Sequence, residues 1–189
     1  MLRIVGGRHR GRSLATPEGT ATRPTASRAR ESLFNILMHA SWRGDGTSPL
    51  VDARVLDAFA GSGALGIEAL SRGAAHATFM DNDPAAIRLI GENLRKLDET
   101  SVARVIRADV TRPPSAREAC GLAFLDPPYR SGLAAPALAA LADAGWLAPG
   151  AIATVELAAT EDLMPPPRFE AIDERRYGAA KILIMRYKP

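Results

Sequence analysis

Cysteine and histidine are scarce, which excludes several kinds of site. Cys120 is the only cysteine among the 189 residues, so the chain forms no internal disulfide and no cysteine-rich metal cluster. The three histidines, His9, His39 and His76, lie far apart in the sequence and lack the spacing of metal ligands. We therefore expect no metal in the site and, because a disulfide framework is missing, a cytoplasmic protein.

Long apolar runs are absent as well. The most apolar stretch, residues 133–155, is interrupted by Asp143, Gly145, Pro149 and Gly150, whereas a membrane-spanning helix needs about 20 predominantly apolar residues. The first residues lack the apolar segment and cleavage site of a secretory signal. With 47% hydrophobic and 24% charged residues, the composition is typical of one compact globular domain. We expect a monomer that contacts no membrane.

Acidic residues are rare in the first thirty positions. That segment has seven arginines and a single acid, Glu18, whereas the whole chain has a net charge of only +3, so the remainder is slightly acidic. An arginine-rich arm on an acidic body favours binding to a phosphate backbone, since each neutralised phosphate releases counterions. A solvated basic surface without a partner explains the same charges equally well.

From residue 53 onward, strand-like apolar segments alternate with helical ones. This order predicts an α/β protein with a doubly wound, Rossmann-like sheet of seven strands, mostly parallel and ending in an antiparallel hairpin. Ligands bind such sheets at the carboxyl ends of the strands. We predict strands over 54–59, 77–81, 102–108, 122–125, 151–156, 169–177 and 180–186, and helices over 64–72, 84–97 and 133–144.

The first part of the chain departs from this alternation. Residues 2–5 and 12–15 flank glycines and predict a small N-terminal β-hairpin. Residues 22–25 predict an extended connection, since the residue before a proline avoids helical geometry. Ser27 predicts the N-cap of the helix that follows.

A glycine motif follows the first predicted strand of the sheet. Residues 61–66 read G-S-G-A-L-G, directly after that strand and at the start of a helix. Glycines at these positions permit a tight turn, close approach of a ligand and close packing of the helix on the strand. Asp81 ends the next strand, where a carboxylate accepts hydrogen bonds from ribose hydroxyls. A purely structural turn is the alternative, but the strand, helix and acid together favour binding.

Asp57 helps to identify the ligand. It lies four residues before Gly61, where a dinucleotide would place its pyrophosphate. A carboxylate there repels phosphate and attracts the ammonium group of a methionine moiety, which favours S-adenosylmethionine. Asp109, at the end of the third strand, either accepts the adenine amino group or simply caps the next turn. The predicted cofactor-binding residues are Asp57, Ala58, Phe59, Gly61, Ser62, Gly63, Asp81, Asn82 and Asp109.

The sequence Asp126-Pro127-Pro128-Tyr129, after the fourth strand, is the strongest chemical signal. An exocyclic amine of a base is a poor nucleophile because its lone pair is delocalised into the ring. The Asp126 carboxylate and the Pro127 carbonyl would accept its two hydrogens and direct the lone pair toward a methyl group, while the prolines hold the backbone. Tyr129 offers a ring on which a flipped-out base can stack. These four residues are the predicted catalytic set; a proline turn without function is the alternative.

Together these segments resemble the RsmD family of bacterial 16S rRNA guanine-N2 methyltransferases. The similar segments are residues 57–74, residues 126–129, and shorter matches at 3–7, 11–12, 23–25, 28, 30–35 and 176–178. They extend over nearly the whole chain. The resemblance implies methyl transfer from S-adenosylmethionine to the N2 amino group of one guanine in small-subunit ribosomal RNA, within an assembled subunit.

The resemblance also implies how the roles are divided. The glycine loop and Asp57 would hold the methionine end of the cofactor, Asp81 its ribose and Asp109 its adenine, and residues 126–129 would hold the guanine. The chain then divides into a basic arm, residues 1–25, that contacts RNA, and a methyltransferase domain, residues 26–189. The residues predicted to bind RNA are Arg3, Arg8, Arg10, Arg12, Arg23, Arg28 and Arg130.

Three other functions remain open at this point. A DNA adenine-N6 or other nucleic-acid amino methyltransferase would use the same D-P-P-Y chemistry, although 189 residues leave little room for a target-recognition domain. A NAD-dependent oxidoreductase is disfavoured by Asp57 and by the D-P-P-Y motif. A non-catalytic RNA-binding protein on a methyltransferase fold is disfavoured by the intact glycine loop.

Overall fold

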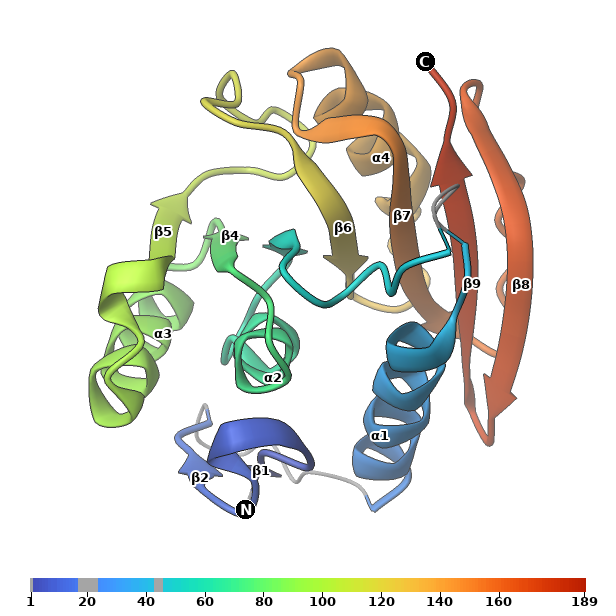
Figure 1. The fold of residues 1–189 in the computed structure, drawn as a ribbon. Helices are drawn as coiled ribbons and strands as arrows, with labels where there is room; N and C mark the ends of the chain where they lie inside the picture. The colour runs from blue at the N-terminus through green and yellow to red at the C-terminus, as the bar shows by residue number, and fades with distance from the viewer. Residues whose placement is uncertain (1, 17–23, 43–45) are drawn as a thin grey trace.

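A seven-stranded sheet forms the centre of the molecule (Figure 1). The structure, a computed structural model, describes residues 2–16, 24–42 and 46–189, and for residues 24–27 the backbone alone. The strands lie in the order β5-β4-β3-β6-β7-β9-β8. Their bounds are β3 Arg54–Ala58, β4 His76–Asp81, β5 Ala103–Arg107, β6 Cys120–Leu125, β7 Leu147–Ala158, β8 Phe169–Tyr177 and β9 Ala180–Tyr187.

Most of the sheet is parallel. β3 pairs in parallel with both β4 and β6, β4 pairs with β5, and β6 pairs with β7. β9 runs antiparallel to β7 and to β8. The predicted fold class, a mostly parallel seven-stranded Rossmann-like sheet with a terminal antiparallel hairpin, is therefore confirmed.

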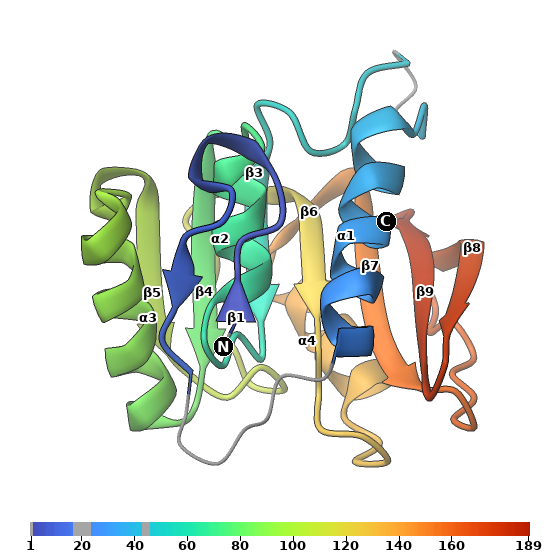
Figure 2. The same cartoon turned by 90° about the horizontal axis from the view of Figure 1, so that it is seen from below.

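Helices cover both faces of this sheet. On one face lie α1 (Pro24–His39), α2 (Ala64–Ser71) and α3 (Pro84–Leu97), and on the other lies α4 (Ala134–Asp143) (Figure 1 and Figure 2). Within the described ranges, no helix is both long and apolar enough to cross a membrane. The remaining elements are β1 (Leu2–Arg3), β2 (Ser13–Leu14) and the short 3₁₀ turns Gly7–His9 and Thr100–Val102.

Side chains alternate along the strands and so fill two separate cores. Val55, Phe79 and Phe124 are fully buried on the face that α1, α2 and α3 cover. Leu56 and Met80 are fully buried on the face that α4 covers. Because the parallel strands are buried on both faces, they appear in the sequence as short, nearly continuous apolar runs.

The predicted helix bounds agree closely with the structure where capping residues are present. α3 begins at Pro84 directly after Asp83, whose carboxylate accepts the N–H of Ala85 at 2.8 Å. β7 is longer than the predicted 151–156 at both ends. It begins at Leu147, which pairs with Cys120 before an irregularity in the register, and it ends at Ala158.

The start of α1 was predicted wrongly. The helix begins at Pro24, so residues 24 and 25 belong to it and not to an extended connection, and Ser27 lies inside the helix. A proline is well suited to the first helical position, since its missing N–H would have no intrahelical partner there. The other half of the predicted connection, residues 22 and 23, lies outside the described residues.

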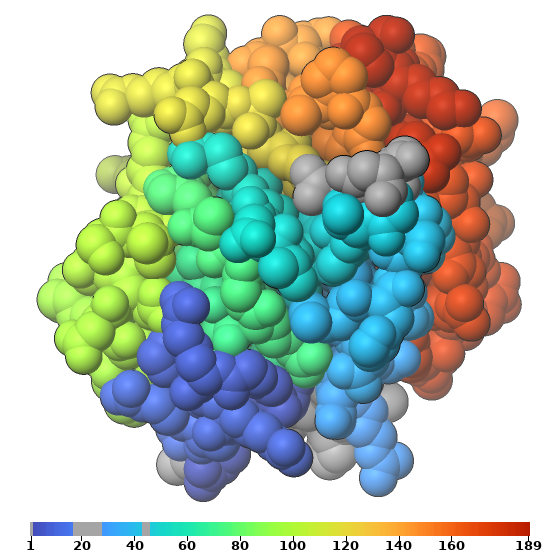
Figure 3. Space-filling view, viewed as in Figure 1, coloured from blue at the N-terminus to red at the C-terminus, as the bar shows by residue number. Residues whose placement is uncertain are grey.

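A buried glutamate joins the N-terminal hairpin to two helices. Glu68 of α2 is 1% exposed, and its carboxylate accepts the N–H of Val5 at 2.9 Å and the Nε of Arg72 at 2.8 Å. Arg30 of α1 lies with its Nε 4.0 Å from the same carboxylate and donates from Nη2 to the carbonyl of Arg3 at 2.7 Å. Figure 3 shows the hairpin, in blue, seated on the helical layer.

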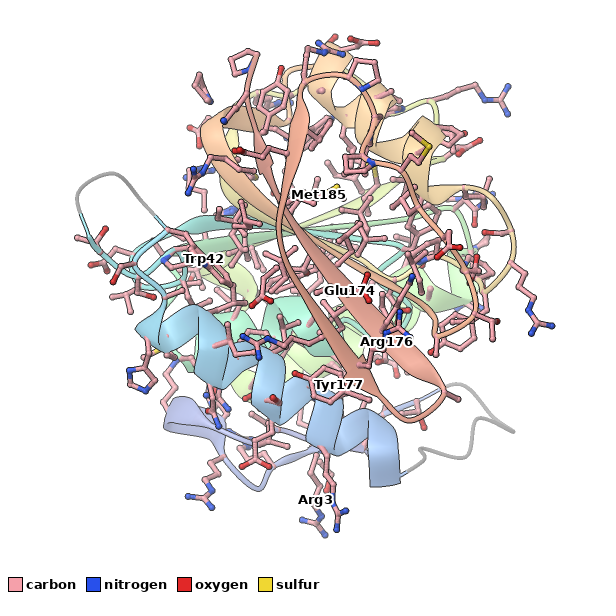
Figure 4. The ribbon with its side chains drawn as sticks, turned by 90° about the vertical axis from the view of Figure 1, so that its right-hand side faces the viewer. Arg3, Trp42, Glu174, Arg176, Tyr177 and Met185 are labelled. Atoms are coloured by element: carbon pink, nitrogen blue, oxygen red, sulfur yellow. The ribbon has the colours of Figure 1, made fainter. Side chains whose placement is uncertain are left out.

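The C-terminal hairpin is held to the opposite side of α1. The hydroxyls of Tyr177 and Ser32 are 2.8 Å apart, and Figure 4 shows Tyr177 beside this helix. Arg186 of β9 donates to the carbonyl of Trp42 at 2.9 Å, just after α1 ends. Contacts in its middle and just beyond its C-terminal end therefore hold α1 against the sheet.

Glu68→Ala is expected to lower the free energy of unfolding by about 3–5 kcal/mol, because the buried guanidinium groups of Arg30 and Arg72 lose their counter-charge. The control is Glu118→Ala, whose ion pair with Arg54 is largely exposed; loss of such a pair costs about 1 kcal/mol or less. Urea unfolding measures both variants. Equal losses would show that Glu68 does not have the role assigned to it.

Candidate active site

The predicted site residues of three strands meet at one edge of the sheet. Ala58 of β3 is in register with Met80 of β4 and with Leu125 of β6. The residues that follow Met80 and Leu125, Asp81 and Asp126, therefore lie at the same edge of the sheet as the glycine loop, which follows Ala58. The N–H of Asp126 still donates to the carbonyl of Ala58, at 3.4 Å.

The glycine loop takes a backbone path that leaves open space beside it. Phe59, Gly61 and Gly63 have φ angles of +61°, +53° and +78°. A Cβ on Gly61 would meet no atom within 4 Å, so this side of the loop is free for a ligand. At Gly66 a Cβ would lie 2.3 Å from Cε1 of Phe79, which explains why the start of α2 needs a glycine to pack on β4.

Asp81 presents a half-buried carboxylate to the loop. Its Oδ2 accepts the N–H of Gly61 at 2.9 Å, and its Oδ1 accepts the N–H of Asp83 at 2.9 Å. These bonds hold the carboxylate at the end of β4, beside the open part of the glycine loop. Asn82, also predicted to bind the cofactor, has an exposed side chain next to it.

Asp57 lies deeper, beneath the loop. It is 1% exposed, and its Oδ2 accepts the N–H of Gly66 at 2.8 Å. Burial is the main reason that the pKa of this carboxyl is raised well above its usual range; the bond from Gly66 opposes the rise, and the nearby carboxyls of Asp126 and Asp81 add to it. No described residue donates a hydrogen bond to its second oxygen, Oδ1.

The loop is also tied to the N-terminal hairpin. Asn93 of α3 is 1% exposed, and its Nδ2 donates to the carbonyls of Ser62 at 3.0 Å and of Ala15 at 3.1 Å. Its Oδ1 accepts the N–H of Ala15 at 2.8 Å. Sequence reasoning missed this residue, because an asparagine within an amphipathic helix gives no signal of such a role.

Asp109 is engaged in its own turn. Its Oδ1 accepts the N–H and the hydroxyl of Thr111, at 2.9 and 2.7 Å, and its Oδ2 accepts from Arg112. The bond from the Thr111 hydroxyl is the main cause that lowers the pKa of Asp109. The structure thus shows the turn-capping arrangement that the sequence left open as an alternative.

The D-P-P-Y segment leads away from β6 at the same edge. Pro127 is buried, Pro128 is exposed, and Tyr129 is 46% exposed. The side chain of Asp126 opens toward solvent, but protein surrounds its carboxyl on the other sides. This burial is the main cause that raises the pKa of Asp126 to about 7, and the carboxylate of Glu156 raises it as well.

Glu156, near the end of β7, was not among the predicted site residues. It is half-buried, and its Oε1 accepts the hydroxyl of Tyr129 at 2.6 Å. The sequence contained only one signal of its position, since the predicted strand 151–156 ends at this residue. Its proximity to Asp126 depends on the pairing of β6 with β7, which no local pattern reveals.

The predicted RNA-binding arginines lie in three places. Of those in the hairpin, Arg8 forms a salt bridge with Glu99, while Arg3 and Arg12 donate to backbone carbonyls of Gly11 and Lys96. Arg10 is exposed in the same hairpin, Arg28 is exposed on α1, and Arg130 is exposed beside Tyr129. Arg23 lies outside the described residues.

Acidic groups therefore surround the open glycine loop. Asp57, Asp81 and Asp126 are close enough for two of them to raise the pKa of the third, and Glu156 acts in turn on Asp126. Such a cluster attracts a cationic ligand and repels the pyrophosphate of a dinucleotide. The arrangement fits a sulfonium cofactor beside an amine whose hydrogens need acceptors.

Comparisons with known proteins agree with this geometry. The model of a family described as "Conserved hypothetical protein 95" matches residues 2–186. "Ribosomal RNA small subunit methyltransferase D" of Escherichia coli (strain K12) is 42% identical over 156 residues, 82% of this chain and 74% of that protein. The Haemophilus influenzae protein of the same name is 34% identical over 182 residues, 94% of this chain and 89% of that one. A solved structure named "Putative methyltransferase yhhF from Escherichia coli" has a TM-score of 0.81 and 36% identity, over 99% of this chain and 98% of that chain.

The carboxyl of Asp126 is expected to titrate near pH 7, as its pKa of about 7 requires. Glu156→Gln should lower this pKa, since loss of a neighbouring negative charge favours ionisation. Carbon-13 chemical shifts of the aspartate carboxyls across a pH series measure both values. The control is Glu92→Gln, on the exposed face of α3, which should leave the pKa of Asp126 unchanged. An unaltered titration in Glu156→Gln would contradict the interaction.

Proposed function

The chain belongs to the RsmD family, and on this basis we propose that it transfers a methyl group from S-adenosylmethionine to the N2 amino group of a guanine in 16S ribosomal RNA. The observation that supports this most strongly is the place of Asp126, beside the open glycine loop and next to the exposed ring of Tyr129. The names of the curated relatives favour ribosomal RNA over DNA as the substrate.

The residues around the glycine loop fit S-adenosylmethionine. The open space at Gly61 would admit a ligand, and the carboxylate of Asp81, which binds the N–H of Gly61, would accept the ribose hydroxyls. The free oxygen of Asp57, Oδ1, is the acceptor that we assign to the ammonium group. Asp109 would contribute to the adenine end through its turn. When bound, the cofactor supplies a methyl group made electrophilic by the positive sulfur.

Asp126 and Pro127 would act on the amine. The ionised carboxylate of Asp126 and the carbonyl of Pro127 accept the two N2 hydrogens, so that the lone pair of N2 points away from both acceptors. As the bond from N2 to the methyl carbon formed and the bond from that carbon to sulfur broke, N2 would lose a proton, which Asp126, with a pKa of about 7, would receive. Tyr129 would stack on the base once it has left the RNA helix.

The N-terminal hairpin would bind the RNA. We assign this role to residues 1–25, within which the described arginines Arg3, Arg10 and Arg12 face solvent. Arg8 is exposed as well, and its salt bridge with the buried Glu99 also anchors the hairpin to the end of α3. Arg28 and Arg130 would extend the same interface toward the catalytic residues.

Methyl transfer to small subunits tests the proposal directly. Subunits purified from a strain that lacks this protein should gain one N2-methylguanosine when incubated with the enzyme and S-adenosylmethionine, as mass mapping of the 16S RNA would show. Asp126→Ala should abolish transfer and leave cofactor affinity nearly intact. In the wild type the rate should rise as the pH passes about 7 and then level off, because the ionised form of Asp126 is the active one. Methylation of another base, or none, would refute the function.

Cofactor binding gives a second test. Asp81→Ala should weaken binding of S-adenosylmethionine by about 1–3 kcal/mol, since buried ribose hydroxyls lose a charged acceptor. Calorimetric titration measures the affinity. Asp83→Ala, which removes the N-cap of α3 but keeps the backbone N–H that donates to Asp81, controls for local disruption. Equal affinities for Asp81→Ala and the wild type would remove Asp81 from the ribose role.

The role of the hairpin in RNA binding is tested by salt dependence. Replacing Arg3, Arg10 and Arg12 with glutamine should weaken binding to the small subunit. The slope of log affinity against log salt should become shallower by about 0.7–0.9 for each phosphate that the variant no longer neutralises. Arg175→Gln with Arg176→Gln, on the far edge of the sheet, is the control. Cofactor affinity should not change. An unaltered slope would place the RNA footprint elsewhere.

A further inference from the structure

Glu156 lies beside the catalytic aspartate on the neighbouring strand. Leu125 of β6 and Val155 of β7 are the last residues of this parallel pairing, and the residues that follow them, Asp126 and Glu156, interact electrostatically. Leu125 and Val155 both pack in the core on the α4 side, and the residues that follow face the side of α1. Arg30 of α1 accordingly experiences the negative charge of Glu156, which opposes the lowering of its pKa by burial.

Among the described residues, the carboxylate of Glu156 accepts a hydrogen bond and forms no salt bridge. Its Oε1 accepts the hydroxyl of Tyr129 at 2.6 Å. Within residues 2–16, 24–42 and 46–189, no lysine, arginine or histidine forms a salt bridge with it, and no group donates to Oε2. Arg30 of α1 attracts Glu156 without forming a salt bridge with it, so in the described part of the chain Oε2 remains an unoccupied acceptor beside Asp126. Its free oxygen therefore points to a donor on the substrate.

The Watson–Crick edges of the bases differ in what they offer to two neighbouring acceptors. Guanine presents two adjacent donors, the N2 amino group and N1–H. Adenine and cytosine also present an amino group, but the ring nitrogen beside it is an acceptor whose lone pair would be repelled by a carboxylate. Two adjacent carboxylates therefore match guanine and exclude the other amino-bearing bases.

We propose that Glu156 determines specificity for guanine: Oε2 accepts the N1–H of the target base while Asp126 and Pro127 hold its N2 amino group. This inference rests on the proposed function, because it concerns the base in the same site. Tyr129 then has two tasks, since its ring stacks on the base and its hydroxyl fixes the carboxylate of Glu156. A site whose buried acceptor is left unpaired by the wrong base discriminates far better than an apolar pocket does.

The test compares guanosine with 2-aminopurine at the target position of small subunits reconstituted from synthetic RNA. 2-Aminopurine keeps the amino group at C2 but has an acceptor at N1. Rates are measured at pH 8.5, where Asp126 is ionised in every variant. The wild type should prefer guanosine by about 100-fold or more in kcat/KM. Glu156→Gln can donate from its amide to N1 of 2-aminopurine, so this preference should fall at least about tenfold.

Two further variants keep the result interpretable. Tyr129→Phe retains the ring but releases Glu156, and should also reduce the preference for guanosine. Glu92→Gln, exposed on α3, should preserve it. If Glu156→Gln slowed both substrates equally, or left the ratio unchanged, the role in specificity would be refuted while the proposed function stood. If the wild type failed to methylate the guanosine subunits, the proposed function itself would fail.

Discussion

β3 pairs in parallel with β4 on one side and with β6 on the other, and this double pairing determines where the polar groups of the site lie. Strands in parallel register end at the same edge of the sheet. The glycine loop, Asp81 and Asp126 therefore meet there, although Gly61 and Asp126 are 65 positions apart in the sequence. A shift of one residue in either pairing would turn buried side chains to the opposite face. The two apolar cores therefore protect the geometry of the site.

Carboxyl groups are concentrated at this edge, and the fold stabilises two of them with backbone donors. Asp57 accepts from Gly66, and Asp81 accepts from Gly61 and Asp83. Burial is the main cause that raises the pKa of Asp57 and of Asp126, neighbouring carboxylates add to it, and the bond from Gly66 opposes the rise at Asp57 without removing it. The proposed cationic cofactor and the donor groups of the proposed base would both be favoured by this concentration of carboxyl groups.

The N-terminal hairpin is bound to the domain through buried polar residues on α2 and α3. Glu68 accepts from Val5, and Asn93 joins Ala15 to the carbonyl of Ser62 in the glycine loop. The hairpin proposed to contact RNA is thus connected through one side chain to the loop proposed to hold the cofactor.

Local patterns in the sequence determined the fold class and the bounds of most helices and strands. They also identified the glycine loop and the D-P-P-Y segment as candidate parts of the site. Apolar runs mark strands that are buried on both faces, and caps such as Asp83-Pro84 mark a helix start, because these preferences act over a few residues. Only the tertiary structure decided that Glu68 and Asn93 would be buried anchors and that Glu156 would lie beside Asp126. Those contacts depend on strand order and helix packing between distant segments, and a polar residue at the end of a strand or within a helix looks the same whether it meets solvent or a partner.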